Sequence, residues 1–110
     1  MANQPPGSER RVAPRYPLIA DTVVTDLNTD THISTRTSDI SQSGCYLDTM
    51  NPFPGTTPVR VRITHNGQTF EAIGEIPYAQ PNMGMGVHFT EVSPDNRALL
   101  QKWLAEVGGG

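Results

Sequence analysis

The sequence predicts an all-β protein, a six-stranded antiparallel β-barrel with a C-terminal helix that covers one open end. Ten glycines and ten prolines among 110 residues favour short elements joined by turns. Apolar and polar residues alternate along most of the chain, and a helical pattern follows only at the end. Because closure of a barrel removes unpaired sheet edges, a barrel is the expected arrangement of these strands.

The chain is long enough for one modest hydrophobic core. It has 110 residues, of which 35% are hydrophobic. We therefore expect a single domain over residues 10–107. Residues 1–9 are polar and rich in proline, and residues 108–110 are glycines without side chains to pack. Both ends are expected to be flexible.

Period-two alternation and the turn residues between the alternating segments predict the positions of the strands. The polar segment 38–44, which ends in Gly44, is expected to be a loop. The last strand contains Gly84 and Gly86, which permit another part of the chain to approach closely. The six expected strands are residues 18–26, 32–37, 45–47, 59–65, 68–78 and 83–89.

The strongest local signal is the pair Asn66-Gly67 between two alternating segments. Asn-Gly favours a type I′ turn, whose positive φ angles suit the twist of a β-hairpin. A two-residue turn would place the apolar residues of both strands on one face. The pairs expected from it are His65 with Gln68, Ile63 with Phe70, and Val61 with Ala72.

The C-terminal segment carries the signals of a capped helix. Ser93 suits the N-cap, Pro94 the first helical position, and Asp95 the positive end of the helix dipole. Apolar residues then recur at helical spacing and form one stripe. The stripe consists of Leu99, Leu100, Trp103, Leu104 and Val107.

Charge and composition narrow the function. A formal net charge of -3 argues against general attraction to nucleic acid polymers or anionic membranes, so any bound anion must be recognised locally. The single cysteine excludes an intramolecular disulfide, and the N-terminus has no apolar segment of the kind that a secretory signal needs. No segment is apolar enough to span a membrane. We expect a cytoplasmic protein without membrane insertion.

Two polar clusters are hard to explain by folding alone. Three arginines, Arg10, Arg11 and Arg15, lie within six positions ahead of the first strand. Arginine presents a planar fork of donors that fits phosphate oxygens or the O6 and N7 edge of guanine. In the second cluster, Asp39 can accept hydrogen bonds from guanine N–H groups and Ser41 can donate to a phosphate. Together the clusters suit a guanine nucleotide.

The same residues carry a family resemblance. Arg11-x-x-x-Arg15 followed by Asp39-x-Ser41-x-x-Gly44 resembles the two-part signature of the PilZ family of cyclic di-GMP receptors. The resemblance implies a bacterial, non-enzymatic receptor whose ligand is cyclic di-GMP and which uses no cofactor. It also implies that Arg11 and Arg15 clamp phosphate and guanine. Asp39 and Ser41 would hold a base edge and a phosphate, and Gly44 would leave room for the ligand.

Two further positions can be compared with the family. Arg10 resembles an extra arginine that affects whether one ligand or an intercalated pair is bound, so it belongs to the expected site. Tyr78 lies about where some members have a stacking aromatic residue. A single tyrosine in a barrel more often packs. We therefore leave Tyr78 out of the expected site.

Several other residues that could carry chemistry are expected to be structural. The three histidines are far apart and lack metal-ligand spacing with Cys45, which predicts strand-surface histidines and no metal site. Cys45 is expected to be a small buried residue, and Trp103 a core residue. Asp39 and Ser41 have no histidine placed near them by the sequence, so no catalytic triad is expected.

Three functions remain open at this point. The first is a cyclic di-GMP receptor that passes the level of this second messenger to a protein partner. The second is a PilZ-like protein-interaction module that does not bind the ligand. The third is a small barrel that binds single-stranded nucleic acid through the arginine arm. The intact signature favours the first, and the acidic balance argues against the third.

Overall fold

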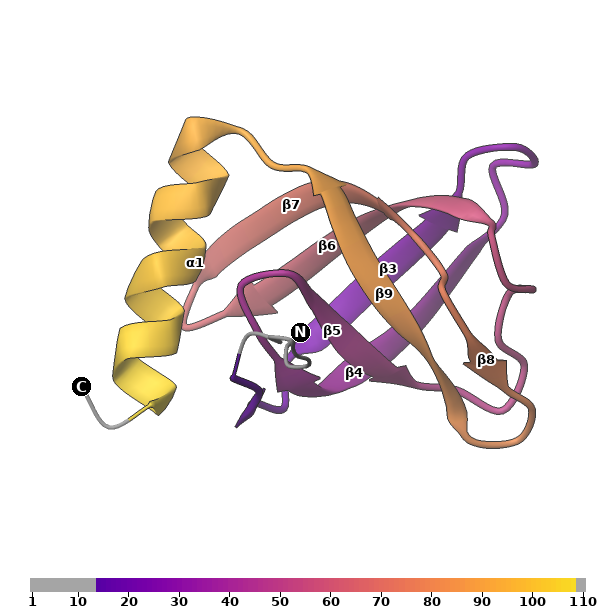
Figure 1. Cartoon of the computed structure of the whole chain (residues 1–110), viewed down its shortest axis with the longest axis horizontal. Helices are drawn as coiled ribbons and strands as arrows, with labels where there is room; N and C mark the ends of the chain where they lie inside the picture. Colours follow the sequence, from indigo (N-terminus) through magenta and orange to yellow (C-terminus); the bar gives the residue numbers. More distant parts are fainter. Residues whose placement is uncertain (1–13, 109–110) are drawn as a thin grey trace, which may run out of the picture.

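The computed structural model describes residues 14–108, which form one antiparallel β-sheet and one helix (Figure 1). Six strands are five to nine residues long, and two have only two residues. The elements are β2 (Tyr16–Pro17), β3 (Asp21–Asp26), β4 (His32–Ile40), β5 (Gly44–Asp48), β6 (Pro58–His65), β7 (Gln68–Glu75), β8 (Ala79–Gln80), β9 (Gly84–Glu91) and α1 (Pro94–Val107).

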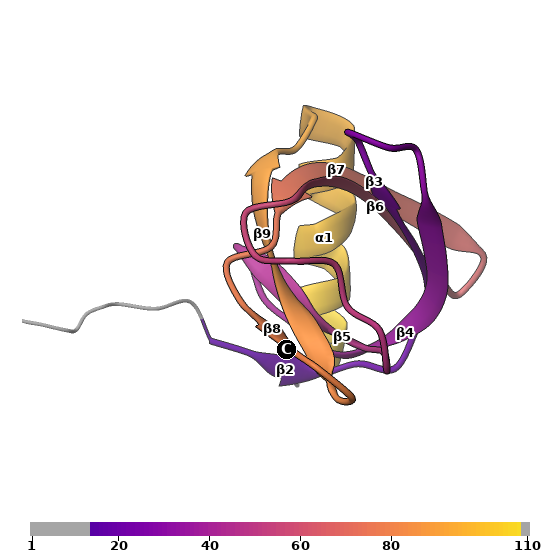
Figure 2. The ribbon, with the colours of Figure 1, turned by 90° about the vertical axis from the view of Figure 1, so that its right-hand side faces the viewer.

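The six longer strands close into a barrel. They pair in the order β4-β3-β6-β7-β9-β5, and β5 pairs with β4 to complete the ring, which Figure 2 shows end-on. The short strands add to this ring, β2 along the end of β4 and β8 along β9. The predicted six-stranded antiparallel barrel is confirmed, and closure leaves few unpaired edges.

The hairpin between β6 and β7 has the predicted register. His65 pairs with Gln68, and the two apolar pairs further along the strands also form as expected. Asn66 and Gly67 have φ angles of 53° and 75°, as a type I′ turn requires. Val61, Ile63, Phe70 and Ala72 consequently point into the core.

The helix closes one end of the barrel (Figures 1 and 2). The Ser93 side chain accepts a hydrogen bond from the Asn96 N–H at 3.2 Å, which confirms the predicted N-cap. Leu100, Trp103 and Leu104 are buried, and the other two residues of the predicted stripe are partly buried against the core. Trp103 is fully buried with its ring centroid 6.2 Å from that of Phe70, which confirms it as a core residue.

Two predicted boundaries were wrong around β4. The first strand begins at Asp21 rather than at residue 18, because the hydroxyl of Thr37 accepts a hydrogen bond from the Ala20 N–H and donates one to the Leu18 carbonyl. These side-chain bonds replace part of the ladder. The predicted loop 38–44 is much shorter, because residues 38–40 belong to β4 and Gly44 begins β5. Distant segments, β2 and β5, supply the pairing.

The strand after the Asn-Gly turn ends earlier than predicted. It stops at Glu75, and the ladder with β9 is irregular between Ile73 and Gly74. Pro77 follows and has no N–H to donate to a ladder, so the chain leaves the sheet there. Tyr78 therefore lies in the connection to β8 rather than on β7.

Candidate functional site

The pairing of β2 with β4 creates the candidate site. Tyr16 lies opposite Ile40 and Pro17 opposite Asp39, so the segment ahead of the barrel runs alongside the end of β4. This pairing brings Arg15 to Asp39, which is 24 positions away in the chain. The structure thus joins the two predicted clusters at these two residues. Arg10 and Arg11 lie outside the described residues.

Arg15 and Asp39 form a two-pronged ion pair. Arg15 Nη2 donates to Asp39 Oδ1 at 3.0 Å and to Oδ2 at 3.1 Å, and Arg15 Nε donates to Oδ1 at 3.3 Å. The side chains are 49% and 29% exposed, so a ligand can reach both. The hydrogen bonds to Asp39 raise the pKa of Arg15, against an opposing effect of burial. The guanidinium is therefore charged at neutral pH, and its fork is occupied by the carboxylate.

The turn between β4 and β5, residues 41–43, is held by Ser41. The Ser41 side-chain oxygen accepts hydrogen bonds from the Ser43 and Gly44 N–H groups, each at 3.2 Å, and the Ser41 N–H donates to the Gly44 carbonyl at 2.8 Å. Ser41 is 6% exposed. This hydroxyl shapes the turn, as serine side chains often do. Its predicted donation to a phosphate stays a prediction.

Gly44 is required by the packing of two strands. A Cβ added there would lie 2.0 Å from the Val87 carbonyl oxygen on β9, which is far inside contact distance. The glycine therefore permits β5 and β9 to approach each other. The sequence interpretation assigned it to ligand approach, and that role stays a prediction.

The rings of two tyrosines, Tyr46 and Tyr78, pack against two glycines beside the ion pair. A Cβ on Gly86 would lie 2.6 Å from the Tyr78 ring, and one on Gly84 would lie 2.7 Å from the Tyr46 ring. The rings stack with centroids 6.2 Å apart, and the Tyr46 hydroxyl donates to Gln80 Oε1 at 2.5 Å. The predicted close-approach glycines thus accommodate these two rings.

Tyr78 packs, as expected for it, but on the outside of the barrel, where its ring stays exposed. It has 43% of its surface exposed. Its ring packs on the outer face of β9 instead of the core, because the chain has already left β7. Tyr78 was considered and left out of the expected site, and its neighbour Tyr46 was not considered. The signal that could have found them is the pair Gly84 and Gly86 on one strand face, which leaves space for two rings.

The ion pair and Tyr78 lie between two depressions. A small one of about 150 Å³ is lined, among others, by Arg15, Tyr78, His88, Ser41, Ser43 and Gly44. A wider, open one of about 710 Å³ has Arg15 and Tyr78 in common with it. The remaining lining residues of the wider depression are Pro17, Ser38, Asp39, Tyr46, Gln80 and Met83. A ligand with two flat bases and two phosphates could contact charge and an aromatic face at once.

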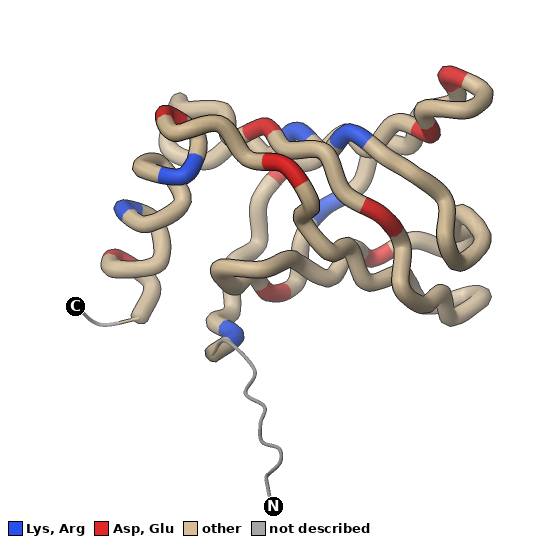
Figure 3. Tube along the Cα trace, turned by 45° about the horizontal axis from the view of Figure 1, so that its top comes forward, with Lys and Arg blue, Asp and Glu red and all other residues tan. Residues whose placement is uncertain are grey.

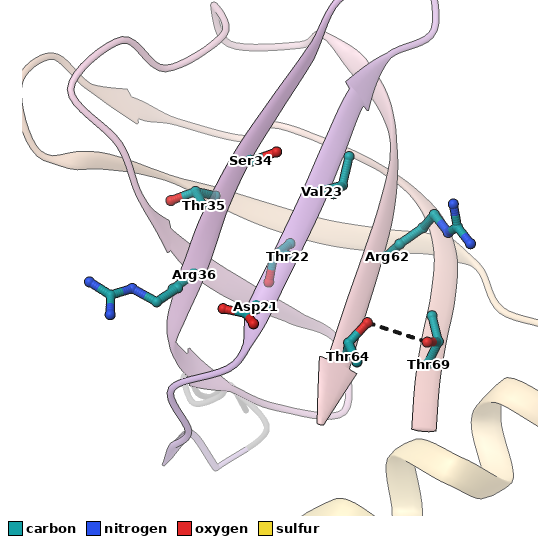
Figure 4. A pocket seen from close by; sticks show the side chains of 9 residues that line it. All are labelled: Asp21, Thr22, Val23, Ser34, Thr35, Arg36, Arg62, Thr64 and Thr69. Carbon is teal, nitrogen blue, oxygen red and sulfur yellow. Dashed lines mark hydrogen bonds between the residues drawn. The ribbon is translucent and has the colours of Figure 1, made fainter. Parts of the chain in front are cut away.

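A third depression, also of about 710 Å³, lies over β3, β4 and β6 (Figure 4). It contains none of the residues of the PilZ-like signature. Arg36 and Arg62 line it, but their side chains point to opposite sides in Figure 4 and do not converge on one ligand. Ser34 and Thr64 add only hydroxyl groups. This surface does not offer a defined anion site.

Charge is distributed evenly over the described part of the chain. Lys and Arg are scattered among Asp and Glu along the trace in Figure 3 and form no single basic cluster. Arg60 and Arg62 both form ion pairs with Glu71, with distances of 3.8 and 3.6 Å from their Nε atoms to Glu71 Oε2. Such a distribution does not favour the extended phosphate backbone of a nucleic acid polymer.

Residues 14–108 contain no metal-binding group of three or more His, Cys, Asp and Glu side chains. His32 and His88 are exposed and His65 is half-buried, each on a strand, as expected for strand-surface histidines. Cys45 is buried, as predicted, and burial raises the pKa of its thiol. A thiol that stays protonated is a poor nucleophile. Within the same residues, no helix has the length and apolar character needed to cross a membrane.

Solved structures share this fold. The chain is similar to the PilZ domain of Escherichia coli YcgR with c-di-GMP, with a TM-score of 0.73, 14% identity and coverage of 92% of this chain and 93% of that one. It is similar to the PilZ domain of CeSA from a cellulose-synthesizing bacterium, with a TM-score of 0.65, 20% identity and coverage of 88% and 97%. At these identities the likeness shows the fold alone.

A third similar structure is the inhibitor of motility MotI/DgrA of Bacillus subtilis, with a TM-score of 0.71 and 16% identity. The likeness covers 89% of this chain but only 50% of that one, so this chain spans about half of that protein's length. A search of curated proteins finds no match. The family model described as PilZ domain matches residues 9–106, and the chain therefore belongs to the PilZ domain family.

Proposed function

We propose that this chain is a non-enzymatic receptor for cyclic di-GMP. The observation that carries the proposal is the meeting of Arg15 and Asp39 between two depressions, beside the exposed ring of Tyr78. A planar cation, a carboxylate and an aromatic face are the groups that recognise phosphate, the guanine N–H edge and a base plane. The c-di-GMP complex of the similar Escherichia coli domain supports the choice of ligand.

Binding would exchange the partners of the ion pair. In the free protein the fork of Arg15 is satisfied by Asp39. The ligand offers phosphate oxygens or guanine O6 and N7 to Arg15, and guanine N–H donors to Asp39. Both groups would stay paired after the exchange, so neither charge is left without a partner. Arg11 and Arg10 would add contacts from the preceding segment, with Arg10 affecting the number of ligands.

The remaining residues would act through shape. Ser41 and Gly44 fix the path of the turn and the approach of β9, and exposed N–H or hydroxyl groups of that turn could meet a phosphate. Tyr78 would stack on a base, a role that its exposure favours. The bound state would then present a changed surface to a protein partner. The alternative function is a protein-interaction module that does not bind the ligand.

Titration calorimetry on the folded chain tests the proposal. Cyclic di-GMP should bind far more tightly than cyclic di-AMP, GTP or a short RNA, because adenine lacks guanine's N–H donors at the positions that Asp39 would read. Arg15→Ala should weaken binding at least about tenfold, since a charge-assisted hydrogen bond contributes about 1.5–3 kcal/mol. Arg15→Lys should restore little, because an ammonium has no planar fork.

The matched control is Arg36→Ala, an exposed arginine on β4 that lies outside both depressions of the site. It should bind like the wild type. Absence of cyclic di-GMP binding by the wild type would overturn the receptor proposal and favour the ligand-independent interaction module. Equal affinity for cyclic di-AMP would overturn the role of Asp39 in base recognition.

A further inference from the structure

A side chain of the helix holds the turn of the candidate site. Arg97, in the first turn of α1, donates from Nη1 to the Gln42 carbonyl oxygen at 2.8 Å, although the two residues are 55 positions apart. Figure 1 shows the β4–β5 turn on the side of the barrel that carries α1. The turn therefore contacts the element that closes the barrel as well as the ligand site.

The turn has only a few long-range anchors. The Ser43 carbonyl accepts a hydrogen bond from the Phe89 N–H on β9 at 2.8 Å. The preceding carbonyl, that of Gln42, accepts the hydrogen bond from Arg97. The other hydrogen bonds of the turn are the local ones made by Ser41. Gln42 and Ser43 are exposed, so little packing fixes the turn. Among the described residues, Arg97 is the one side chain of α1 that bonds to this turn.

Arg97 is not needed to keep the helix in place. Leu100, Trp103 and Leu104 anchor α1 in the core, and the Asn96 side chain accepts a hydrogen bond from the Glu71 N–H at 2.8 Å. An exposed charge-assisted bond adds little to stability by comparison with this burial. The contribution of Arg97 should therefore lie in where it holds the turn.

We propose that Arg97 is a positioning residue that sets the geometry of the Ser41–Ser43 turn for ligand binding and couples this turn to α1. The coupling rests on the proposed receptor function. If a ligand at Arg15, Asp39 and the turn shifts the Gln42 carbonyl, Arg97 transmits the shift to the first turn of α1. Linkage then requires the reverse effect as well. The factor by which the ligand changes the stability of the Arg97–Gln42 contact equals the factor by which loosening that contact changes ligand affinity.

The test compares Arg97→Ala and Arg97→Lys with a control on the same helix, Lys102→Ala. Lys102 is exposed and donates to the Gln68 side chain at the other hairpin. In the free protein, amide hydrogen exchange of Ser43 and Gly44 should become faster in Arg97→Ala, stay unchanged in Lys102→Ala, and return towards wild type in Arg97→Lys. Unchanged exchange in Arg97→Ala would overturn the positioning role.

Calorimetry with cyclic di-GMP tests the coupling. Arg97→Ala should weaken binding about three- to tenfold, less than Arg15→Ala does, because Arg97 bonds to the turn and not to the ligand. The melting temperature should stay unchanged, and lysine should rescue binding in part. Amide shifts of residues 94–98 on ligand addition should shrink in the same variant. Wild-type affinity in Arg97→Ala would overturn the coupling and leave the receptor proposal intact. Failure of the wild type to bind would overturn the receptor proposal and the coupling, while the exchange measurement still decides the positioning role.

Discussion

The two hairpins β6–β7 and β4–β5 make their turns in different ways. The first uses two residues, Asn66 and Gly67, both with positive φ angles, and nothing lies within 4 Å of a Cβ placed on Gly67. The second uses residues 41–43, whose hydrogen bonds come from Ser41, from β9 and from Arg97 on α1. One turn is specified by its own backbone preferences, the other by its own Ser41 together with distant parts of the chain.

The difference shows where a small barrel can place a binding site. A turn that satisfies local rules needs no partners and offers no groups arranged by other elements. A turn held by two other elements, here β9 and α1, brings polar groups of both together, and its position responds to either of them. The candidate site lies at the second turn. Four changes test this contrast, beginning with the largest expected effect.

The glycines of the two hairpins should differ most. Gly44→Ala would place a Cβ against the Val87 carbonyl, a backbone atom that cannot move aside, so it should lower the free energy of unfolding by at least about 3 kcal/mol. In Gly67→Ala the added Cβ contacts no neighbour. This variant should lose only about 1–2 kcal/mol of unfolding free energy, because alanine is strained in the left-handed backbone conformation. Urea unfolding of both variants measures this, and equal losses would contradict the contrast.

The serine of the long-range turn comes next. Ser41→Ala leaves the buried Gly44 N–H and the Ser43 N–H without their acceptor, so it should cost about 1–3 kcal/mol of unfolding free energy. Ser43→Ala is the matched control. Its exposed hydroxyl contacts only that of Ser41, at 3.3 Å, and its loss should cost less than about 0.5 kcal/mol. Urea unfolding curves of the two variants decide between these expectations.

A residue just beyond each turn provides a pH test. Cys45 is buried, and its thiol pKa is raised above the ordinary value of 9.0, mainly by burial, whereas Gln68 is exposed. The folded protein keeps the thiol neutral, while the unfolded chain ionises above pH 9. This contribution to stability is therefore complete below pH 9 and is lost as pH rises further, by about 1 kcal/mol per pH unit.

Denaturation of the wild type and of Cys45→Ala between pH 7 and pH 10.5 measures this loss. The decline above pH 9 should be steeper in the wild type, because the variant lacks the titrating thiol. A thiol reagent should modify Cys45 only after unfolding. Parallel pH profiles of the two proteins, or rapid labelling of the folded protein, would show that the thiol is accessible.

Breaking the ion pair of the site should have the smallest effect on the free energy of unfolding. Arg15→Ala breaks an exposed pair and should change the free energy of unfolding by less than about 1 kcal/mol. The control is Arg62→Ala, which removes one of the two exposed arginine partners of Glu71 on the other hairpin and should have a similarly small effect. A large loss for Arg15→Ala alone, seen by thermal melting, would mean that the pair serves folding rather than binding.

Local patterns predicted the parts of the fold that depend on neighbours in sequence. The Asn66-Gly67 turn fixed the register of its hairpin, and Ser93 and Pro94 began the helix where expected. The end of β4 was predicted as loop, because its pairing comes from β2 and β5 rather than from its own residues. Tyr78 was assigned to a strand by alternation, which Pro77 interrupts.

By itself, the sequence determined the residue types and spacing of the candidate site, with Arg15 before the first long strand and Asp39 and Ser41 near the end of β4. Tertiary structure alone decided that Arg15 meets Asp39, that Tyr78 is exposed beside them, and that Arg97 reaches the turn. The reason is physical. Turns and caps depend on backbone preferences a few residues apart, whereas these contacts join segments that only the closure of the barrel brings together.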